Sequence, residues 1–353
     1  MTGKNKIDQG QPLFGFKCCV KSVAESVEFS VALFKLFSIE LLGKTLEGVL
    51  RQKQQIGNAA KTKDEDKSSK EHKSGFYYIH AFLKHILCHS GYNHKMKKEI
   101  LITNDDGFDA EGLKALIEAL KDLAHLTIVA PSSEKSACGH SLTLTHPLRF
   151  VQVDDDFFKL DDGTPSDCVY LALHSLYGEE KPDLLISGIN RGANLGEDIT
   201  YSGTVAGAME AVLHGVPAIA ISQVLGMSQH SADVDYSLAQ KVIRDIVSKV
   251  FEGEFPLPHR ELLNINVPPH TSNINYEITY AGYRFYENDA HLHRNPRAEE
   301  FWWLGLHPLQ WKQREFEGTT DFDAIEQGKV SLTPVMLDLT AYKSLDRLKA
   351  FLA

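Results

Sequence analysis

The 353-residue sequence has no stretch of about 18 uninterrupted apolar residues, the length that a membrane-spanning helix requires. Its five cysteines include no Cys-x-x-Cys pair, so neither a zinc site nor a disulfide framework is indicated. The first residues lack the basic, apolar and small-residue succession of a secretory signal peptide. These absences argue against an integral membrane protein and a disulfide-rich secreted domain, and we expect a cytoplasmic protein.

Basic side chains are scarce over most of the chain. Residues 1–95 carry 15 Lys and Arg against 9 Asp and Glu, a net charge of +6. Because the whole chain has a net charge of −10, residues 96–353 have a net charge of −16. Such an acidic body argues against a broad nucleic-acid-binding surface. An anionic substrate would need a local positive centre, and a bound metal ion is the natural candidate.

Residues 1–95 differ in pattern from the rest. Apolar residues at helical spacing in 16–50 and 75–90 predict amphipathic helices, and the charged stretch 61–73 predicts a flexible linker. We interpret this part as an N-terminal extension whose role stays open. Three interpretations are open. The segment is an accessory part that packs on the body or on a partner, or it precedes a true start at Met96. Contact with a membrane surface is a third interpretation, which we favour less.

From Met96 onward, short apolar runs alternate with amphipathic segments, which is typical of an α/β protein with a mostly parallel sheet and helices on both faces. Apolar runs predict strands over 99–103, 126–130, 183–187, 216–222, 262–267 and 329–333. Helical spacing predicts helices over 110–122, 165–177, 202–215, 236–251 and 341–352. An antiparallel excursion is expected over 142–160 and hairpins over 276–316.

The first strand ends abruptly on two adjacent carboxylates, Asp105 and Asp106, followed by Gly107. In open α/β sheets, ligands bind beyond the carboxyl ends of the strands. The two aspartates therefore lie where chemistry is expected, although an ordinary turn between strand and helix is an equal alternative. Two consecutive aspartates on a sharp turn can reach one ion, because the turn breaks the alternation of a strand.

Three loops, 104–109, 131–141 and 188–204, follow predicted parallel strands and should converge on one sheet edge. Their oxygen and nitrogen donors are Asp105, Asp106, Ser133, Ser136, His140, Asn190, Asn194, Ser202 and Thr204. Oxygen donors suit magnesium, manganese or calcium rather than zinc or copper. Taken singly, each residue has an ordinary explanation as a turn, loop or capping residue, so the hypothesis depends on their convergence.

The triplet Ser202-Gly203-Thr204 at a predicted helix start can bind an anion through backbone N–H groups and the positive end of the helix dipole. A plain helix cap by Ser202 is the simpler interpretation. A hard metal ion beside such a site predicts phosphate-ester hydrolysis. The attacking group would be water or a metal-bound aspartate, and the sequence does not distinguish them.

Five motifs in order resemble the SurE family of metal-dependent 5′(3′)-nucleotidases: Ile102–Gly107, Val129–Pro131 with Ser136–Ser141, Gly163–Cys168, Ser187–Gly192 and Tyr201–Thr204. The resemblance runs from about Lys98 to about Thr340. It implies a Rossmann-like domain over 96–353 and a homodimer or homotetramer built partly by exchanged C-terminal segments from about residue 270. It further implies hydrolysis of nucleoside monophosphates and, in some members, of polyphosphate.

By motif position, the resemblance places the ligands of one divalent cation per subunit, magnesium or manganese, on Asp105, Asp106, Ser136 and Asn190. It places phosphate contacts on or near Asn194, Ser202, Gly203, Thr204 and His140. The catalytic part falls to the aspartate pair. Cys138 stands where threonine or another small residue is expected, a departure that should matter little.

Three other functions fit parts of the pattern. A signalling receiver domain also places paired acids after its first strand, but it would lack the loops at Asn190 and Ser202. Haloacid dehalogenase phosphatases need Asp-x-Asp, whereas Asp105 and Asp106 are adjacent. A nucleotide-binding module without catalysis would bind tightly and release no phosphate.

Overall fold

The computed structural model describes residues 97–178, 180–226, 234–271, 273–286, 289–305, 308–312 and 316–353. They belong to the second of two compact units of the chain, residues 95–353. The extension predicted over 1–95 and the start predicted at Met96 lie outside the described residues. Within these described ranges, no helix is long and apolar enough to cross a membrane.

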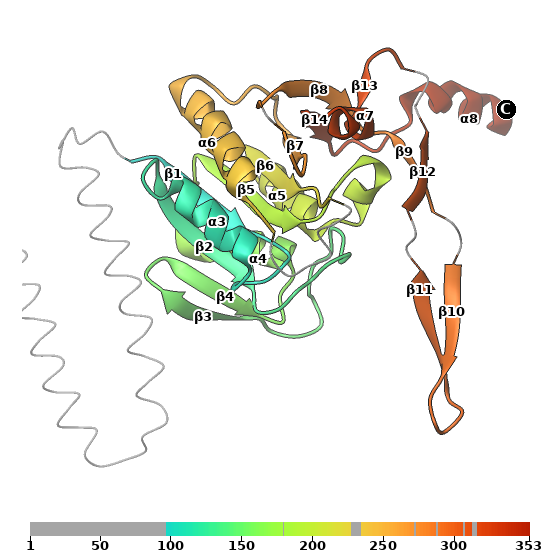
Figure 1. Ribbon diagram of the computed structural model, residues 1–353, viewed down its shortest axis with the longest axis horizontal. Coiled ribbons are helices and arrows are strands. Elements are labelled where there is room, and N and C mark those ends of the chain that lie inside the picture. The colour runs from blue at the N-terminus through green and yellow to red at the C-terminus, as the bar shows by residue number, and fades with distance from the viewer. Residues whose placement is uncertain are drawn as a thin grey trace, which may run out of the picture. The chain divides into compact units, whose positions relative to one another are not determined.

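A ten-stranded sheet forms the centre of this unit (Figure 1). Its strands are β1 (Glu99–Thr103), β2 (His125–Pro131), β3 (Arg149–Asp154), β4 (Phe157–Asp161), β5 (Leu184–Arg191), β6 (Ala218–Gln223), β7 (Glu261–Val267), β8 (Tyr276–Tyr280), β13 (Thr319–Thr320) and β14 (Val330–Met336). They lie in the order β13-β8-β14-β7-β6-β5-β1-β2-β4-β3. Strands β7 to β4 of this order run parallel, whereas β14 is antiparallel to β7 and β3 to β4. The predicted α/β class with a mostly parallel sheet is confirmed.

Helices cover both faces of the sheet, as the sequence predicts. On one face, α3 (Glu111–Leu120) and α6 (Ser237–Glu252) contribute to the same buried cluster as Ile100 and Ile102 of β1. On the other, α4 (Pro165–Ala172) and α5 (Gly203–Leu213) pack on Leu101. Successive side chains of a strand point to opposite faces, so a central strand covered on both sides is apolar throughout.

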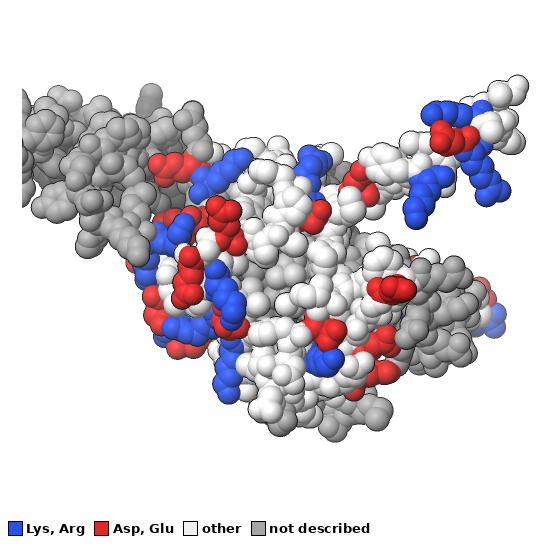
Figure 2. Space-filling view, turned by 90° about the horizontal axis from the view of Figure 1, so that it is seen from above, with Lys and Arg blue, Asp and Glu red and all other residues white. Residues whose placement is uncertain are grey.

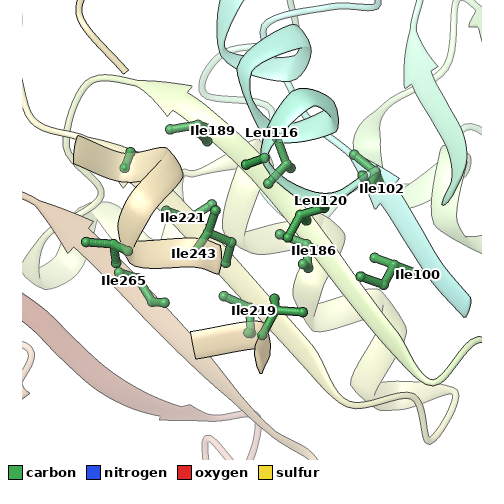
Figure 3. Close-up of a cluster of buried hydrophobic side chains, with 14 of the residues drawn as sticks. Ile100, Ile102, Leu116, Leu120, Ile186, Ile189, Ile219, Ile221, Ile243 and Ile265 are labelled. Atoms are coloured by element: carbon green, nitrogen blue, oxygen red, sulfur yellow. The ribbon is translucent and has the colours of Figure 1, made fainter. Parts of the chain in front are cut away.

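Figure 3 shows the first of these two cores, where β-branched side chains of neighbouring strands meet the helices. Ile100, Ile186 and Ile219 come from β1, β5 and β6, and Leu116 and Ile243 reach them from α3 and α6. All five are fully buried. This packing holds the central strands in register and so fixes where the loops after them begin.

The start of α4 forms as predicted, since Thr164 accepts the N–H of Asp167 and the Asp167 carboxylate accepts the N–H of Thr164. The predicted excursion over 142–160 is shorter than expected: only β3 and β4 form strands, and residues 141–148 form a loop. A helix that the sequence analysis missed, α7 (Asp321–Glu326), precedes β14.

The expected hairpins appear between β8 and β13, outside the main sheet (Figure 1). They are two antiparallel ribbons, one of β9 (Tyr283–Tyr286) and β12 (Pro308–Lys312), the other of β10 (Asp289–Arg294) and β11 (Glu300–Gly305). Strand β8 instead joins the main sheet beside β14. The predicted final helix forms as a 3₁₀ turn, Tyr342–Ser344, followed by α8 (Leu345–Leu352).

Candidate functional site

The loops after β1, β2 and β5 meet at one sheet edge because these strands are neighbours. The Lys135 N–H donates to the Asp105 carbonyl at 2.7 Å, which ties the loop after β2 to the loop after β1. The Arg191 N–H donates to Asp106 Oδ2 at 3.0 Å, which brings in the end of β5. Backbone contacts therefore hold the three loops together around the two aspartates.

Asp105 is the most enclosed of the candidate ligands, with 4% of its surface exposed. The hydroxyl of Thr204, on the first turn of α5, donates to Asp105 Oδ1. Burial raises the pKa of this carboxyl above its ordinary value, and the hydrogen bonds from Thr204 act against the rise. The carboxylate thus lies directly against the helix start that the sequence analysis selected.

The surroundings of Asp106 also disfavour its ionised form. Burial, and then the neighbouring charge of Asp105, raise its pKa to about 6, while the hydrogen bond from Arg191 lowers it. The carboxylate of Glu134 raises the pKa of both aspartates further. Acids crowded in this way favour a bound cation, because a positive charge compensates both burial and mutual repulsion.

The two neutral candidate ligands are the sequence neighbours of Lys135 and Arg191, whose N–H groups bond to this pair. Ser136 is exposed on the loop after β2, and its hydroxyl donates to Glu134 Oε1 at 2.8 Å. Asn190, 9% exposed at the end of β5, donates from Nδ2 to the Gly192 carbonyl at 3.0 Å, so ligation would fall to its Oδ1. Among the described residues, no three His, Cys, Asp or Glu side chains gather as a metal-ligand cluster. Two carboxylates, a hydroxyl and an amide oxygen are the donor types that hard cations prefer, so the cation site expected of these four residues stays a prediction.

The start of α5 is closely packed against Asp105. Ser202 caps the helix by accepting the Val205 N–H at 3.0 Å. A Cβ atom placed on Gly203 would lie 2.8 Å from Asp105 Cβ and 2.9 Å from Cys138 Sγ, distances that side chains do not tolerate. Only glycine allows this close approach, which leaves the first N–H groups of the helix beside the carboxylate.

Asn194 lies in a buried network of polar side chains that the sequence analysis missed. Its Nδ2 donates to Ser222 Oγ at 2.8 Å, and its N–H donates to Asn266 Oδ1 at 2.8 Å. Asn264 and Asn266 both donate to its carbonyl at 2.9 Å. The available signal was the alternation of two asparagines with apolar residues in β7, a strand buried on both faces.

His140 lies beside a second residue that was missed, Glu210 in the middle of α5. Glu210 is 4% exposed, and its carboxylate binds His140 Nε2 at 2.7 Å and His214 Nε2 at 2.9 Å. Burial raises the pKa of Glu210, but the two histidines outweigh it, so the pKa is lowered overall. The sequence signal for Glu210 was a single carboxylate in a helix whose other side chains are mostly small or apolar.

The structure therefore brings some of the predicted site residues into direct contact, whereas the side chains of others have different partners. Asp105, Gly203 and Thr204 touch one another, and Asp106 is the neighbour of Asp105. The side chains of Asn194 and His140 hydrogen-bond to Ser222 and Glu210, and the phosphate contacts expected of them stay predictions.

Known proteins are similar in sequence to this chain over more than two thirds of its length. The sequence model of the family described as "Survival protein SurE" matches residues 100–288. A protein of Sulfurimonas denitrificans named 5′-nucleotidase SurE is 62% identical over 265 residues, which are 73% of this chain and all of that protein. A protein of Helicobacter hepaticus with the same name is 58% identical over 70% of this chain and 96% of its own length.

A solved structure shares the fold. The crystal structure of the SurE protein from Aquifex aeolicus is 40% identical and superposes with a TM-score of 0.62. The match covers 72% of this chain and all of the Aquifex chain. The fold and the sequence thus point to the same group of proteins.

Proposed function

This chain belongs to the SurE family, and on that premise we propose that it is a divalent-metal-dependent phosphomonoesterase that hydrolyses nucleoside 5′(3′)-monophosphates to nucleoside and phosphate. The observation that carries the proposal is the direct contact of Asp105 with Gly203 and Thr204 at the start of α5. A candidate metal ligand therefore lies against the N-terminus of a helix, where we propose that an anion binds. A phosphate ester suits both, because it is anionic and offers oxygen donors.

One magnesium or manganese ion per subunit would be held by Asp105, Asp106, Ser136 and Asn190. When bound, the ion supplies positive charge that stabilises the oxygens of the phosphoryl group during hydrolysis. The raised pKa values of Asp105 and Asp106 support this assignment, because both carboxyls gain from a nearby cation.

The chain's own part in the reaction is to hold the phosphate. The N–H group of Gly203 and the dipole of α5 would bind its oxygens, with Ser202, Thr204, Asn194 and His140 as further contacts. The Thr204 hydroxyl, which donates to Asp105, would keep the carboxylate aligned with this site. Fixed donors of this kind favour the transition state because they need no reorganisation during the reaction.

The group that attacks phosphorus is either water or the carboxylate of Asp105. Attack by Asp105 would form an acyl phosphate that can be trapped by acid quenching during turnover of radiolabelled nucleotide. Attack by water would leave the protein unlabelled and invert the configuration at phosphorus. The labelling experiment therefore separates the two routes.

We propose that the protein is a homodimer or homotetramer that uses chain segments after about residue 270. Large apolar side chains in this region support the proposal: Phe301, Trp302 and Trp303 on β11 are more than half exposed, as are Leu348 and Phe351 on α8. Exposed apolar groups of this size are typical of interaction surfaces. Light scattering on the purified protein would measure the subunit number.

The absence of a nucleic-acid surface stays a prediction. On the face shown in Figure 2, the described Lys and Arg side chains are interspersed with Asp and Glu. This face therefore offers no continuous basic surface among the described residues, which supports a small anionic substrate rather than a nucleic acid.

A phosphate-release panel tests the proposed function. The full-length protein is incubated with each nucleoside monophosphate and with polyphosphate, in magnesium, in manganese and in neither. We expect metal-dependent release from the monophosphates, and the panel also decides whether polyphosphate is a second substrate. Nucleotide binding without release under any of these conditions would contradict the proposal.

A further inference from the structure

A fully buried carboxylate outside the proposed site binds the chain segment that leads to the start of α5, where we propose that phosphate binds. Asp321, the first residue of α7, has no exposed surface. Its Oδ2 accepts the Gly196 N–H at 2.6 Å and its Oδ1 accepts the Gly282 N–H at 3.0 Å. A buried carboxylate is unfavourable unless hydrogen bonds compensate it, so these contacts are strongly held.

The two glycines approach each other closely at this point. A Cβ atom on Gly196, whose φ is +56°, would lie 2.7 Å from the Gly282 carbonyl and 2.8 Å from Phe322 Cε2. A Cβ on Gly282 would lie 2.8 Å from Phe322 Cδ2. The backbone of the segment after β5 and the backbone before β9 are therefore packed together by the residues of α7.

A second contact joins the same two segments. Arg284 on β9 forms an ion pair with Asp198, with only 17% and 15% of the two side chains exposed, and the Arg284 N–H donates to Glu197 Oε2 at 2.9 Å. The Asp198 carbonyl in turn accepts the N–H groups of Tyr201 and Ser202, both at 3.0 Å. Asp198 thus connects the base of the C-terminal ribbons to the residue that caps α5.

We propose that Asp321 and Arg284 are positioning residues of the phosphate site. With Asp198 they form a clamp that fixes residues 195–201 and so aligns Ser202 and the first N–H groups of α5 with the substrate phosphate. The clamp also couples that alignment to β9, the start of the ribbons. The inference rests on the proposed function, since it concerns the phosphate of that same site.

The clamp should affect phosphate and metal differently. The proposed metal ligands lie on other segments: Asp105 and Asp106 follow β1, Ser136 lies on the loop after β2, and Asn190 ends β5. The clamp contacts residues 195–201, which follow Asn190 in the sequence. Loosening it should weaken phosphate binding and leave cation binding in place, which a general loss of structure would not do.

The test is Asp321→Asn in the full-length protein, with Asp323→Asn as its matched control. Asp323 lies two residues further along α7 and belongs to the capping box of Thr320. Calorimetry would measure the Kd of Mn²⁺ and, in Mn²⁺, the Kd of inorganic phosphate, alongside KM and kcat for a nucleoside monophosphate. For Asp321→Asn we expect about a tenfold weaker Kd for phosphate and a similar rise in KM, with the Kd of Mn²⁺ within about twofold of wild type. Asp323→Asn should change neither Kd.

Arg284 supplies a second variant, which serves also if Asp321→Asn fails to fold. Arg284→Gln should weaken phosphate binding as Asp321→Asn does, and Arg284→Lys, which keeps the charge opposite Asp198, should restore part of it. Parallel losses of Mn²⁺ and phosphate affinity, or no loss of either, would overturn the clamp. A wild-type protein that binds phosphate but hydrolyses no nucleotide would refute the proposed function alone, and phosphate binding would still decide the clamp.

Discussion

Replacing Asp106 by asparagine should stabilise the metal-free protein while removing a metal ligand. Burial, and then the charge of Asp105, raise the pKa of Asp106 from 3.8 to about 6, so its ionised form opposes folding. Because the folded pKa lies above the unfolded one, the stability contribution of Asp106 is fully present below about pH 4 and is lost as the pH rises through about 6. The shift corresponds to a free-energy penalty of ~3 kcal/mol above that pH. Asparagine keeps an oxygen that can accept the Arg191 N–H and carries no charge.

Urea unfolding of wild type and Asp106→Asn in excess chelator, at one protein concentration, measures this penalty. We expect the difference in the free energy of unfolding to be near zero at about pH 4 and to reach ~3 kcal/mol in favour of the variant at about pH 8. Saturating Mn²⁺ should reduce or reverse this difference in the free energy of unfolding, because ligand binding stabilises only the protein that binds the ligand. A variant that is less stable than wild type at about pH 8 without metal, or a difference that does not change with pH, would refute the reasoning.

Three further predictions concern turnover. Asp105→Asn should abolish hydrolysis without unfolding the protein by circular dichroism, and full activity of the metal-replete variant would remove Asp105 from the site. Gly203→Ala would force a Cβ to 2.8 Å from Asp105 and should lower kcat/KM by ~100-fold, a typical effect of small misplacement. Gly207→Ala, on the same helix with a Cβ contact of 2.9 Å to Thr103, should lose comparable stability, about 1–3 kcal/mol, and keep most turnover; equal kinetic losses would contradict the distinction. Excess EDTA followed by dialysis should silence the wild type, and activity that persists would indicate a metal-free mechanism.

Local sequence patterns predicted the central strands and helices, because burial and helix capping leave a signature within a few neighbouring residues. The apolar run of β1 reflects burial on both faces of the sheet, and the Thr164–Asp167 capping box sets the start of α4. The loops after β1, β2 and β5 could be grouped in advance, because parallel neighbouring strands end at the same edge. The contact of Asp105 with the start of α5 follows from that topology.

The residues that support the site were not predictable in the same way. Asp321 reaches Gly196 across 125 positions of sequence, and no local periodicity carries such a contact. Helix α7 has six residues, too few for a helical repeat to be seen. The network of Asn194 with Asn264 and Asn266 also depends on which strands become neighbours. Long-range pairing, rather than residue chemistry, was the missing information.

The place of β14 in the sheet has a consequence for folding during synthesis. This strand, residues 330–336, lies between β7 and β8, both of which are synthesised about 50 residues earlier or more. Until the ribosome has released it, β7 presents an open edge to other chains, and β8 has no neighbour within the main sheet on that side. A nascent or truncated chain that stops before Val330 should therefore be prone to aggregation, so chaperone contact is expected to matter most in the last stage of translation.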